Sequence, residues 1–158
     1  LKKGGYNNLK VRIVGDVFEK NIAIKEIINS KIDEYGLNNV FELFPFCNNP
    51  SEHYQWADIL TVPSTKPESF GLTAIEGMSA GCLVIAANHG GIKDIVSHNE
   101  TGLLFEPNNT EDFKNQIIDA VNHKDKSLEL IKNGIDTFND KFSIETYKKN
   151  IARIFNPD

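Results

Sequence analysis

Hydrophobic and polar positions follow two different periods along the chain, and these periods predict strands and helices in alternation. Five short runs of mostly apolar residues, several of them β-branched, have the length of strands. Between them, apolar residues recur every three or four positions, which is typical of the buried face of a helix. We expect strands over 9–15, 40–44, 58–62, 83–86 and 102–105, and helices over 21–35, 51–56, 72–80, 92–96, 110–123, 126–138 and 143–155.

The alternation of these elements predicts an α/β fold. Strands separated by helices pair in parallel and form a doubly wound sheet, with helices on both faces. The 158 residues contain no obvious linker, repeat or low-complexity tract, so we expect a single domain over 1–158. Open sheets of this kind bind their ligands at the carboxyl ends of the strands. The loops that follow the strands are therefore the expected place for functional residues.

The loop after the third expected strand carries the most informative residues. It runs from Pro63 to Gly71 and opens directly onto the helix at Leu72. The N–H groups in the first turn of a helix have no intrahelical partner, and together with the positive end of the helix dipole they form an anion site. Because Gly71 has no Cβ, a phosphate can approach the backbone closely there. The turn over 69–71 is therefore a candidate phosphate site.

Two carboxylates flank this turn, Glu68 in the loop and Glu76 in the helix. A carboxylate only accepts hydrogen bonds, and it suits the hydroxyls of a sugar or a ribose. Carboxylates beside an anion site are explained by a ligand that carries hydroxyls on both sides of a phosphate, such as a nucleotide-sugar. The alternative is that Glu76 only complements the helix dipole and that Glu68 is solvated, because acidic residues are common in first helical turns.

Further glycines lie where an open sheet places its ligands. Gly15 ends the first expected strand, and Gly90 and Gly91 form a turn after the strand over 83–86. The backbone amides of this turn are candidates to face a phosphate or a transferred sugar. The G-x-G-x-x-G fingerprint is absent, which argues against a dinucleotide-cofactor site. We treat His89 as a polar loop residue, because a lone histidine is no evidence for a catalytic acid or base.

Composition and charge argue against several classes of function. The formal net charge of −5 is unlike that of a general nucleic-acid binder, which needs a basic face. No apolar run approaches the length of a membrane span. Cys47 and Cys82 are expected to be free buried thiols, and no Cys/His spacing indicates a metal site.

The residues around both glutamates resemble a known family. The run over 67–81 reads P-E-S-F-G-L-T-A-I-E-G-M-S-A-G and is similar to the E-x7-E signature of the retaining glycosyltransferases of family 4, the group 1 glycosyltransferases, which have the GT-B fold. Downstream, N-H-G-G-I-K-D-I-V and T-G-L-L-F-E-P resemble the same family's glycine-rich region, and V-R-I-V-G-D resembles its opening strand. The resemblance covers most of the chain. It implies the Rossmann-like, C-terminal, donor-binding half of a longer two-domain protein, without the N-terminal acceptor domain.

The resemblance also implies a role for each residue of the site. Glu68 would be the catalytic residue and bind hydroxyls of the donor sugar, while Glu76 would hold the ribose hydroxyls. Backbone amides around Gly71 would bind the diphosphate. The reaction would be a transfer of hexosyltransferase type, from a donor such as a UDP- or GDP-sugar to an acceptor hydroxyl, with retention of configuration and with no metal or cofactor. The donor-binding residues expected in total are Ser69, Phe70, Gly71, Leu72, Glu76, Gly90, Gly91 and Gly15.

The chain departs from the family pattern in one respect that affects activity. The arginine and lysine that neutralise the donor diphosphate in the family would precede Leu1, and the acceptor domain is missing. We therefore expect the chain alone to bind donor weakly and to transfer nothing. The parent protein is expected to act in polysaccharide or glycolipid synthesis in the cytoplasm, with peripheral association at the inner face of the membrane.

Three other functions stay open at this point. The first is a nucleotide-sugar 2-epimerase of the same fold, although the extra acid and base groups that it needs are not evident in the sequence. The second is a non-catalytic nucleotide-sugar binding module. The third is a dinucleotide-cofactor domain, which the missing fingerprint disfavours.

The loop over 45–50 contains one large aromatic residue, Phe46. In the family, the corresponding loop lies beside the nucleobase. We expect Phe46 to be a hydrophobic anchor in the core, with packing beside a base as the alternative.

Overall fold

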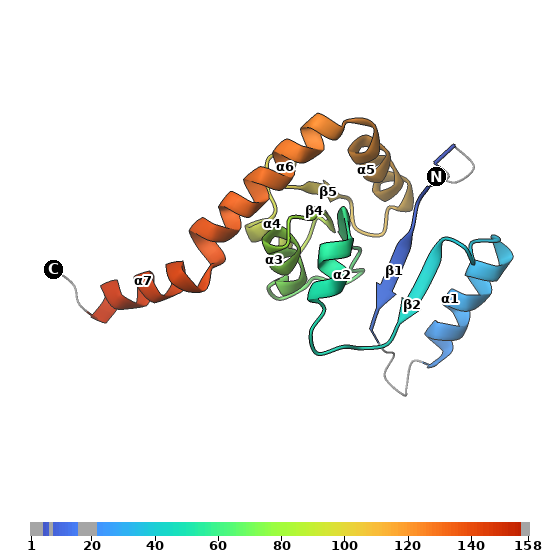
Figure 1. The fold of residues 1–158 in the computed structure, drawn as a ribbon, viewed down its shortest axis with the longest axis horizontal. Coiled ribbons are helices and arrows are strands. Elements are labelled where there is room, and N and C mark those ends of the chain that lie inside the picture. Colours follow the sequence, from blue (N-terminus) through green and yellow to red (C-terminus); the bar gives the residue numbers. More distant parts are fainter. Residues whose placement is uncertain (1–4, 7, 16–21, 156–158) are drawn as a thin grey trace. The chain divides into compact units, whose positions relative to one another are not determined.

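The computed structural model describes residues 5–6, 8–15 and 22–155. By internal contacts it divides into two compact units, Leu1–His53 and Tyr54–Asp158, which can be followed by colour in Figure 1. All strands that pair within these units are parallel, as the alternation of elements predicts. The α/β fold class is thereby confirmed, while the expectation of a single domain over 1–158 stays a prediction.

The first unit is a strand–helix–strand motif. It consists of β1 (Val11–Val14), α1 (Ile22–Glu34) and β2 (Phe41–Phe44). The two strands pair in parallel, with Val11 opposite Phe41. Each strand lies where the apolar pattern places it, and α1 confirms the helix expected over 21–35, whose first residue lies outside the described residues.

The loop after β2 contradicts one expectation. Phe46 was predicted to anchor the core, but 66% of its surface is exposed. The prediction was wrong because it relied on residue type alone. A loop has no helical or strand periodicity that would indicate which of its side chains points inward.

The second unit contains a three-stranded sheet with β4 at its centre. Its strands are β3 (Ile59–Val62), β4 (Leu83–Ala87) and β5 (Leu103–Phe105), in the order β3-β4-β5. A short helix, α2 (Ser51–Trp56), precedes β3 along the chain. Every residue of β4 is buried, as expected for a central strand of a parallel sheet that is covered on both faces.

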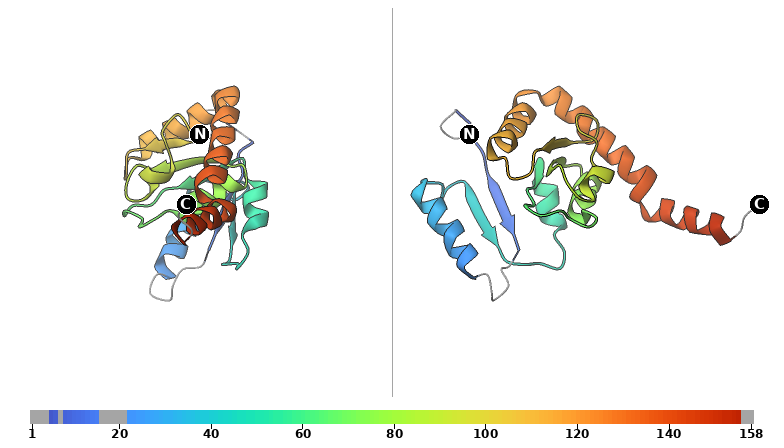
Figure 2. Two further views of the ribbon diagram at one scale, coloured as in Figure 1. Left: turned by 90° about the vertical axis from the view of Figure 1, so that its left-hand side faces the viewer. Right: turned by 180° about the vertical axis from the view of Figure 1, so that it is seen from behind.

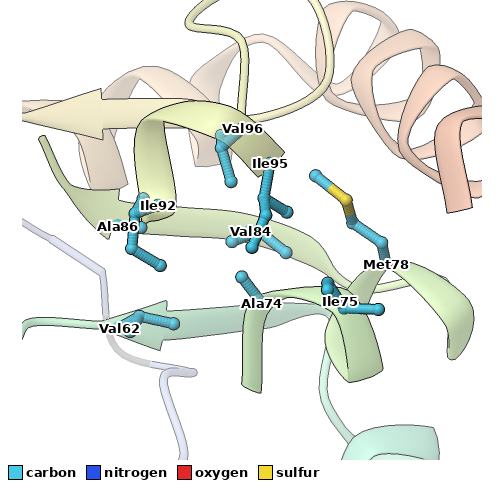
Figure 3. Packing of buried hydrophobic residues seen from close by; sticks show 9 residues of the cluster. All are labelled: Val62, Ala74, Ile75, Met78, Val84, Ala86, Ile92, Ile95 and Val96. Carbon is cyan, nitrogen blue, oxygen red and sulfur yellow. The ribbon is translucent and has the colours of Figure 1, made fainter. Parts of the chain in front are cut away.

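Helices cover both faces of this sheet, so the second unit is doubly wound. On one face, α3 (Leu72–Ser79) and α4 (Ile92–Ile95) pack on β3 and β4, as Figure 3 shows. On the other face, α5 (Thr110–Asn122) and α6 (Lys124–Thr137) contribute side chains to a second cluster with β4 and β5. The first cluster consists of Val62, Ala74, Ile75, Met78, Val84, Ala86, Ile92, Ile95 and Val96.

One contact sets the distance between α3 and the sheet. Gly77 of α3 lies against Leu60 of β3, and a Cβ at position 77 would be only 2.3 Å from Leu60 Cδ2. The absence of a side chain therefore lets the helix pack closely on the strand. At the end of α3, Gly81 has the left-handed backbone expected of a C-cap, with φ of +80°.

The C-terminal part of the second unit is helical throughout. A π-helical turn over Phe138–Phe142, which the sequence pattern did not predict, joins α6 to α7 (Ile144–Phe155). Ser143 caps α7 as expected, because its Oγ accepts a hydrogen bond from the Thr146 N–H at 3.2 Å. Figure 2 shows α7 extending away from the sheet of its own unit.

The expectation of free buried thiols is met for Cys82 and only in part for Cys47. Cys47 and Cys82 are both free, with Cys82 buried and Cys47 half-buried. In the part of the chain that the structure describes, no helix combines the length and the apolar character needed to cross a bilayer.

Candidate functional site

Seven of the eight predicted donor-binding residues, together with Glu68, lie in the second unit around the carboxyl ends of β3 and β4. The loop over 63–71 follows β3 and leads into α3. The turn over 88–91 follows β4 and leads into α4. Because β3 and β4 are parallel neighbours, these two loops leave the sheet at the same edge, where open α/β sheets place ligands.

The loop over 63–71 holds Glu68 through a neighbouring hydroxyl. Ser64 Oγ donates a hydrogen bond to Glu68 Oε1, and both side chains are half-buried. His89 Nε2 lies 2.8 Å from the carbonyl oxygen of Ser64. A carbonyl oxygen can only accept, so Nε2 carries the hydrogen of this bond. The carboxylate keeps further acceptor positions, because its two oxygens offer about four lone-pair sites.

The Gly90–Gly91 turn packs directly against the loop that carries Glu68. The Gly91 N–H donates to the backbone carbonyl of Glu68 at 2.8 Å. A Cβ at Gly90 would lie 2.4 Å from the same carbonyl oxygen, and one at Gly91 would lie 2.7 Å from the carbonyl oxygen of Ser69. Gly90 also has φ of +58°. Two loop backbones can therefore meet here because neither glycine has a side chain.

This packing changes the role expected for one backbone amide. The sequence predicted that the amides of Gly90 and Gly91 face a ligand, whereas the Gly91 N–H is already bonded to Glu68. In this arrangement Gly91 fixes the position of the loop over 63–71. The ligand contact predicted for the Gly90 amide stays a prediction.

The start of α3 lacks a side-chain cap. Its N-cap residue, Gly71, is left-handed with φ of +91°, and no side chain bonds the first turn. A Cβ at Gly71 would lie 2.7 Å from Ile92 Cδ1 and 3.2 Å from Ile95 Cδ1, so the glycine also lets α3 approach α4. The first N–H groups of a helix have no acceptor within the helix. Here the Ala74 N–H donates to the Gly71 carbonyl at 3.0 Å, which leaves the N–H groups of Leu72 and Thr73 and the positive end of the dipole for an anion.

The side chains around this helix start are exposed. Phe70 is 51% exposed and Leu72 is 62% exposed. Ser69 is also exposed. The apolar surface of Phe70 and Leu72 is accessible to a ligand at the helix start.

Glu76 lies on the exposed face of α3. The buried face of the helix consists of Ala74, Ile75, Gly77 and Met78, of which Figure 3 shows three side chains directed into the core. Glu76 Oε2 accepts a hydrogen bond of 2.6 Å from the hydroxyl of Tyr54. Tyr54 could not be selected from the sequence, because it is 22 positions from Glu76. Its only local signal is that it is an aromatic residue near the end of a short helix.

Gly15 lies in the first unit, Leu1–His53. It follows β1, is exposed, and has φ of +140°. Its N–H donates to the Phe44 carbonyl at 3.1 Å, which continues the pairing of β1 with β2. Its predicted contact with a donor stays a prediction.

No metal centre is evident within residues 5–6, 8–15 and 22–155. No group of three or more His, Cys, Asp or Glu side chains in these ranges is placed to hold an ion.

Comparison with known proteins gives one consistent family. A family model described as glycosyl transferases group 1 matches residues 1–137. The alpha-1,3/1,6-mannosyltransferase ALG2 of Dictyostelium discoideum is 33% identical over 141 residues, which cover 86% of this chain and 32% of ALG2.

Solved structures agree with the family model. HepE of Anabaena, in complex with UDP-glucose, is 26% identical and superposes with a TM-score of 0.83 over 92% of this chain and 40% of its own. The C-terminal domain of the group 1 glycosyltransferase LpcC of Francisella tularensis is 24% identical and shows the same fold, with a TM-score of 0.81 over 89% of this chain and 73% of that domain. This chain thus spans 32% of ALG2 and 40% of HepE.

Proposed function

Because the chain belongs to the group 1 glycosyltransferase family, we propose that it forms the donor site of an enzyme that transfers a sugar from a nucleotide-sugar to an acceptor hydroxyl, with retention of configuration. The observation that carries this proposal is the placement of two carboxylates on either side of an uncapped helix start. Glu68 precedes α3 by a few residues, Glu76 lies within it, and no side chain caps the turn between them.

Each part of this arrangement matches one part of a nucleotide-sugar. Glu68, with one oxygen bonded to Ser64, binds hydroxyls of the donor sugar as the catalytic residue. The N–H groups at the start of α3 bind the diphosphate, and Glu76 accepts from the ribose hydroxyls. The remaining members of the proposed donor-binding set are Ser69, Phe70, Gly71, Leu72, Gly90 and Gly15, while Gly91 contributes by fixing the loop that carries Glu68.

The chemistry of the transfer explains why the helix start matters. As the glycosidic bond of the donor breaks, negative charge develops on the departing diphosphate. Fixed N–H groups and the positive end of a helix dipole stabilise such charge without having to reorient. No metal or cofactor is part of this proposal, in agreement with the family signature that the sequence resembles.

The rest of the enzyme is also part of the proposal. HepE was crystallised with UDP-glucose, so a UDP-sugar is the first donor to test. We propose that a further, N-terminal domain binds the acceptor and that this chain alone does not turn over. The parent enzyme is proposed to act in the cytoplasm, at the inner face of the membrane, in polysaccharide or glycolipid synthesis.

Calorimetric titration with UDP, GDP, ADP and their common sugar conjugates tests the donor site. We expect one nucleotide series to bind. Replacing Glu76 by alanine should weaken that binding about tenfold or more, because hydrogen bonds to a charged group contribute roughly 1.5–3 kcal/mol and each 1.4 kcal/mol is about a factor of ten. Glu129→Ala is the matched control, since it removes the same charge from an exposed position of α6.

Two results would contradict the proposal. One is equal binding by the native chain and by Glu76→Ala. The other is an absence of binding for every nucleotide series, including with an N-terminally extended protein that restores the preceding segment.

A further inference from the structure

Tyr54 lies outside the motif that resembles the family signature, yet its hydroxyl donates to Glu76 Oε2 at 2.6 Å. We propose that Tyr54 is a positioning residue that holds Glu76 in the orientation needed to bind the ribose hydroxyls of the donor. This inference rests on the proposed function, because it assigns a role to Tyr54 only through Glu76.

The backbone of Tyr54 is tied to the segment that follows α3. The buried thiol of Cys82 donates to the carbonyl oxygens of Tyr54 at 3.2 Å and of Ala57 at 3.4 Å. Burial, and then the charge of Asp58, raise the pKa of the Cys82 thiol, so it stays protonated and able to donate at neutral pH. The end of α2 is thus attached to the connection that directly follows α3, the helix that carries Glu76.

Without Tyr54, the side chain of Glu76 would have no fixed orientation of its own. Glu76 is on the exposed face of α3, where a long flexible side chain samples many rotamers. Ordering such a side chain when the ligand binds costs conformational entropy. A hydroxyl that already holds one carboxylate oxygen removes part of this cost before binding, and this preorganisation increases affinity.

The same bond leaves the carboxylate able to bind a diol. The Tyr54 hydroxyl uses one of the roughly four lone-pair sites of the two oxygens, so enough acceptor positions remain for two ribose hydroxyls. Glu68 is held in a similar way by the Ser64 hydroxyl. In both cases the side-chain donor is a neutral hydroxyl, which orients the carboxylate without neutralising its charge.

The test compares a ribose ligand with its dideoxy analogue on each protein variant. UDP and 2′,3′-dideoxy-UDP, and the corresponding GDP pair, are titrated into the native chain, Tyr54→Phe, Glu76→Ala and the control Tyr147→Phe, whose ring lies exposed on α7. The native chain should prefer the ribose form, and Glu76→Ala should lose the preference. Tyr54→Phe should reduce the preference by roughly three- to tenfold, because the cost of ordering the Glu76 side chain would then fall on the binding step, and Tyr147→Phe should leave the preference unchanged.

The preference is a ratio measured on one protein, so a lower fraction of folded protein cancels out of it. If Tyr54→Phe keeps the native ratio, or weakens both analogues equally, Tyr54 has no positioning role and the inference is overturned while the donor site stands. If Glu76→Ala keeps the ratio, or if neither UDP nor GDP binds the native chain, the proposed function fails and the inference fails with it.

Discussion

Two helices of the second unit begin in opposite ways. The start of α5 is closed by side chains: Asn109 accepts from the Asp112 N–H at 3.0 Å, and its first turn contains two acidic residues. The start of α3 has a left-handed glycine, Gly71, no side-chain cap and no acidic residue in its first turn. The two helices cover opposite faces of the same sheet, and Gly71 also lets α3 approach α4 closely.

We interpret this difference as one helix terminus that serves stability and one that serves the proposed binding of a donor. At α5, the chain satisfies its own N–H donors and complements the dipole with its own charges. At α3 no side chain caps the first turn, and the two glutamates flank the helix start without capping it. An uncapped start costs stability, and we interpret that cost as the condition for binding a phosphate group there.

The largest expected effect comes from replacing the glycine that opens α3. Gly71→Ala should lower the free energy of unfolding by about 3 kcal/mol, because a left-handed backbone costs a non-glycine residue roughly 1–2 kcal/mol and overpacking adds about 1–3 kcal/mol. The added Cβ would lie 2.7 Å from Ile92 Cδ1. Urea unfolding measures the change, and calorimetry should show weaker nucleotide binding as well.

Gly81→Ala is the matched control for this experiment. Gly81 has φ of +80°, but its nearest neighbour to an added Cβ is Ile135 Cδ1 at an ordinary 3.8 Å. This substitution should cost only the backbone term, roughly 1–2 kcal/mol. Equal losses for Gly71→Ala and Gly81→Ala would show that the close approach of α3 to α4 is unimportant.

Removing the cap of α5 should have a smaller effect, and only on stability. Asn109→Ala is expected to lower the free energy of unfolding by about 1 kcal/mol, the usual contribution of such a cap. Nucleotide affinity should not change, because this helix start carries no part of the proposed donor site. Asn115→Ala, at an exposed position within the same helix, is the control. Loss of nucleotide binding in Asn109→Ala would contradict the division of roles between the two helices.

The smallest expected effect is a pH dependence at the start of α5. The Glu106 N–H, which donates to Asp112 Oδ2 at 2.7 Å, and then Gln116 hold the pKa of Asp112 below its ordinary value. A carboxyl whose pKa is lowered by folding stabilises the protein above its unfolded pKa, and this contribution is lost as the pH falls through the folded pKa. Asp112→Asn should therefore be less stable than the native chain at pH 7, and the difference should shrink toward about pH 3.

Urea titrations of both proteins at the two pH values measure this difference. A gap that stays constant from neutral to acidic pH would mean that the charge of Asp112 contributes nothing beyond its shape and hydrogen bonds.

The sequence was most informative where the signal is local. Periodicity and punctuating glycines are enough to place α3, and Gly81 as its cap, because a helix and its ends depend on neighbouring residues. The motif over 67–81 likewise indicated the family correctly. Both glutamates could be selected because they lie within one such run.

Features that join distant segments could not be predicted in this way. The bond between Tyr54 and Glu76 and the use of the Gly91 N–H by the Glu68 carbonyl depend on how loops from different strands meet. The distribution of the strands over two sheets, and the π-helical turn before α7, also depend on packing and have no local signature. Phe46 shows the same limit, since residue type alone placed it in the core.

The contact between Gly77 and Leu60 limits how this chain can diverge during evolution. A methyl group at position 77 would force either the Leu60 side chain or α3 itself to shift, and a shift of the helix would move the Glu76 carboxylate. The close contact therefore restrains how far α3 can shift to suit a new donor. We expect variants with a changed donor preference to alter side chains that face outward from α3 or from the loop before it.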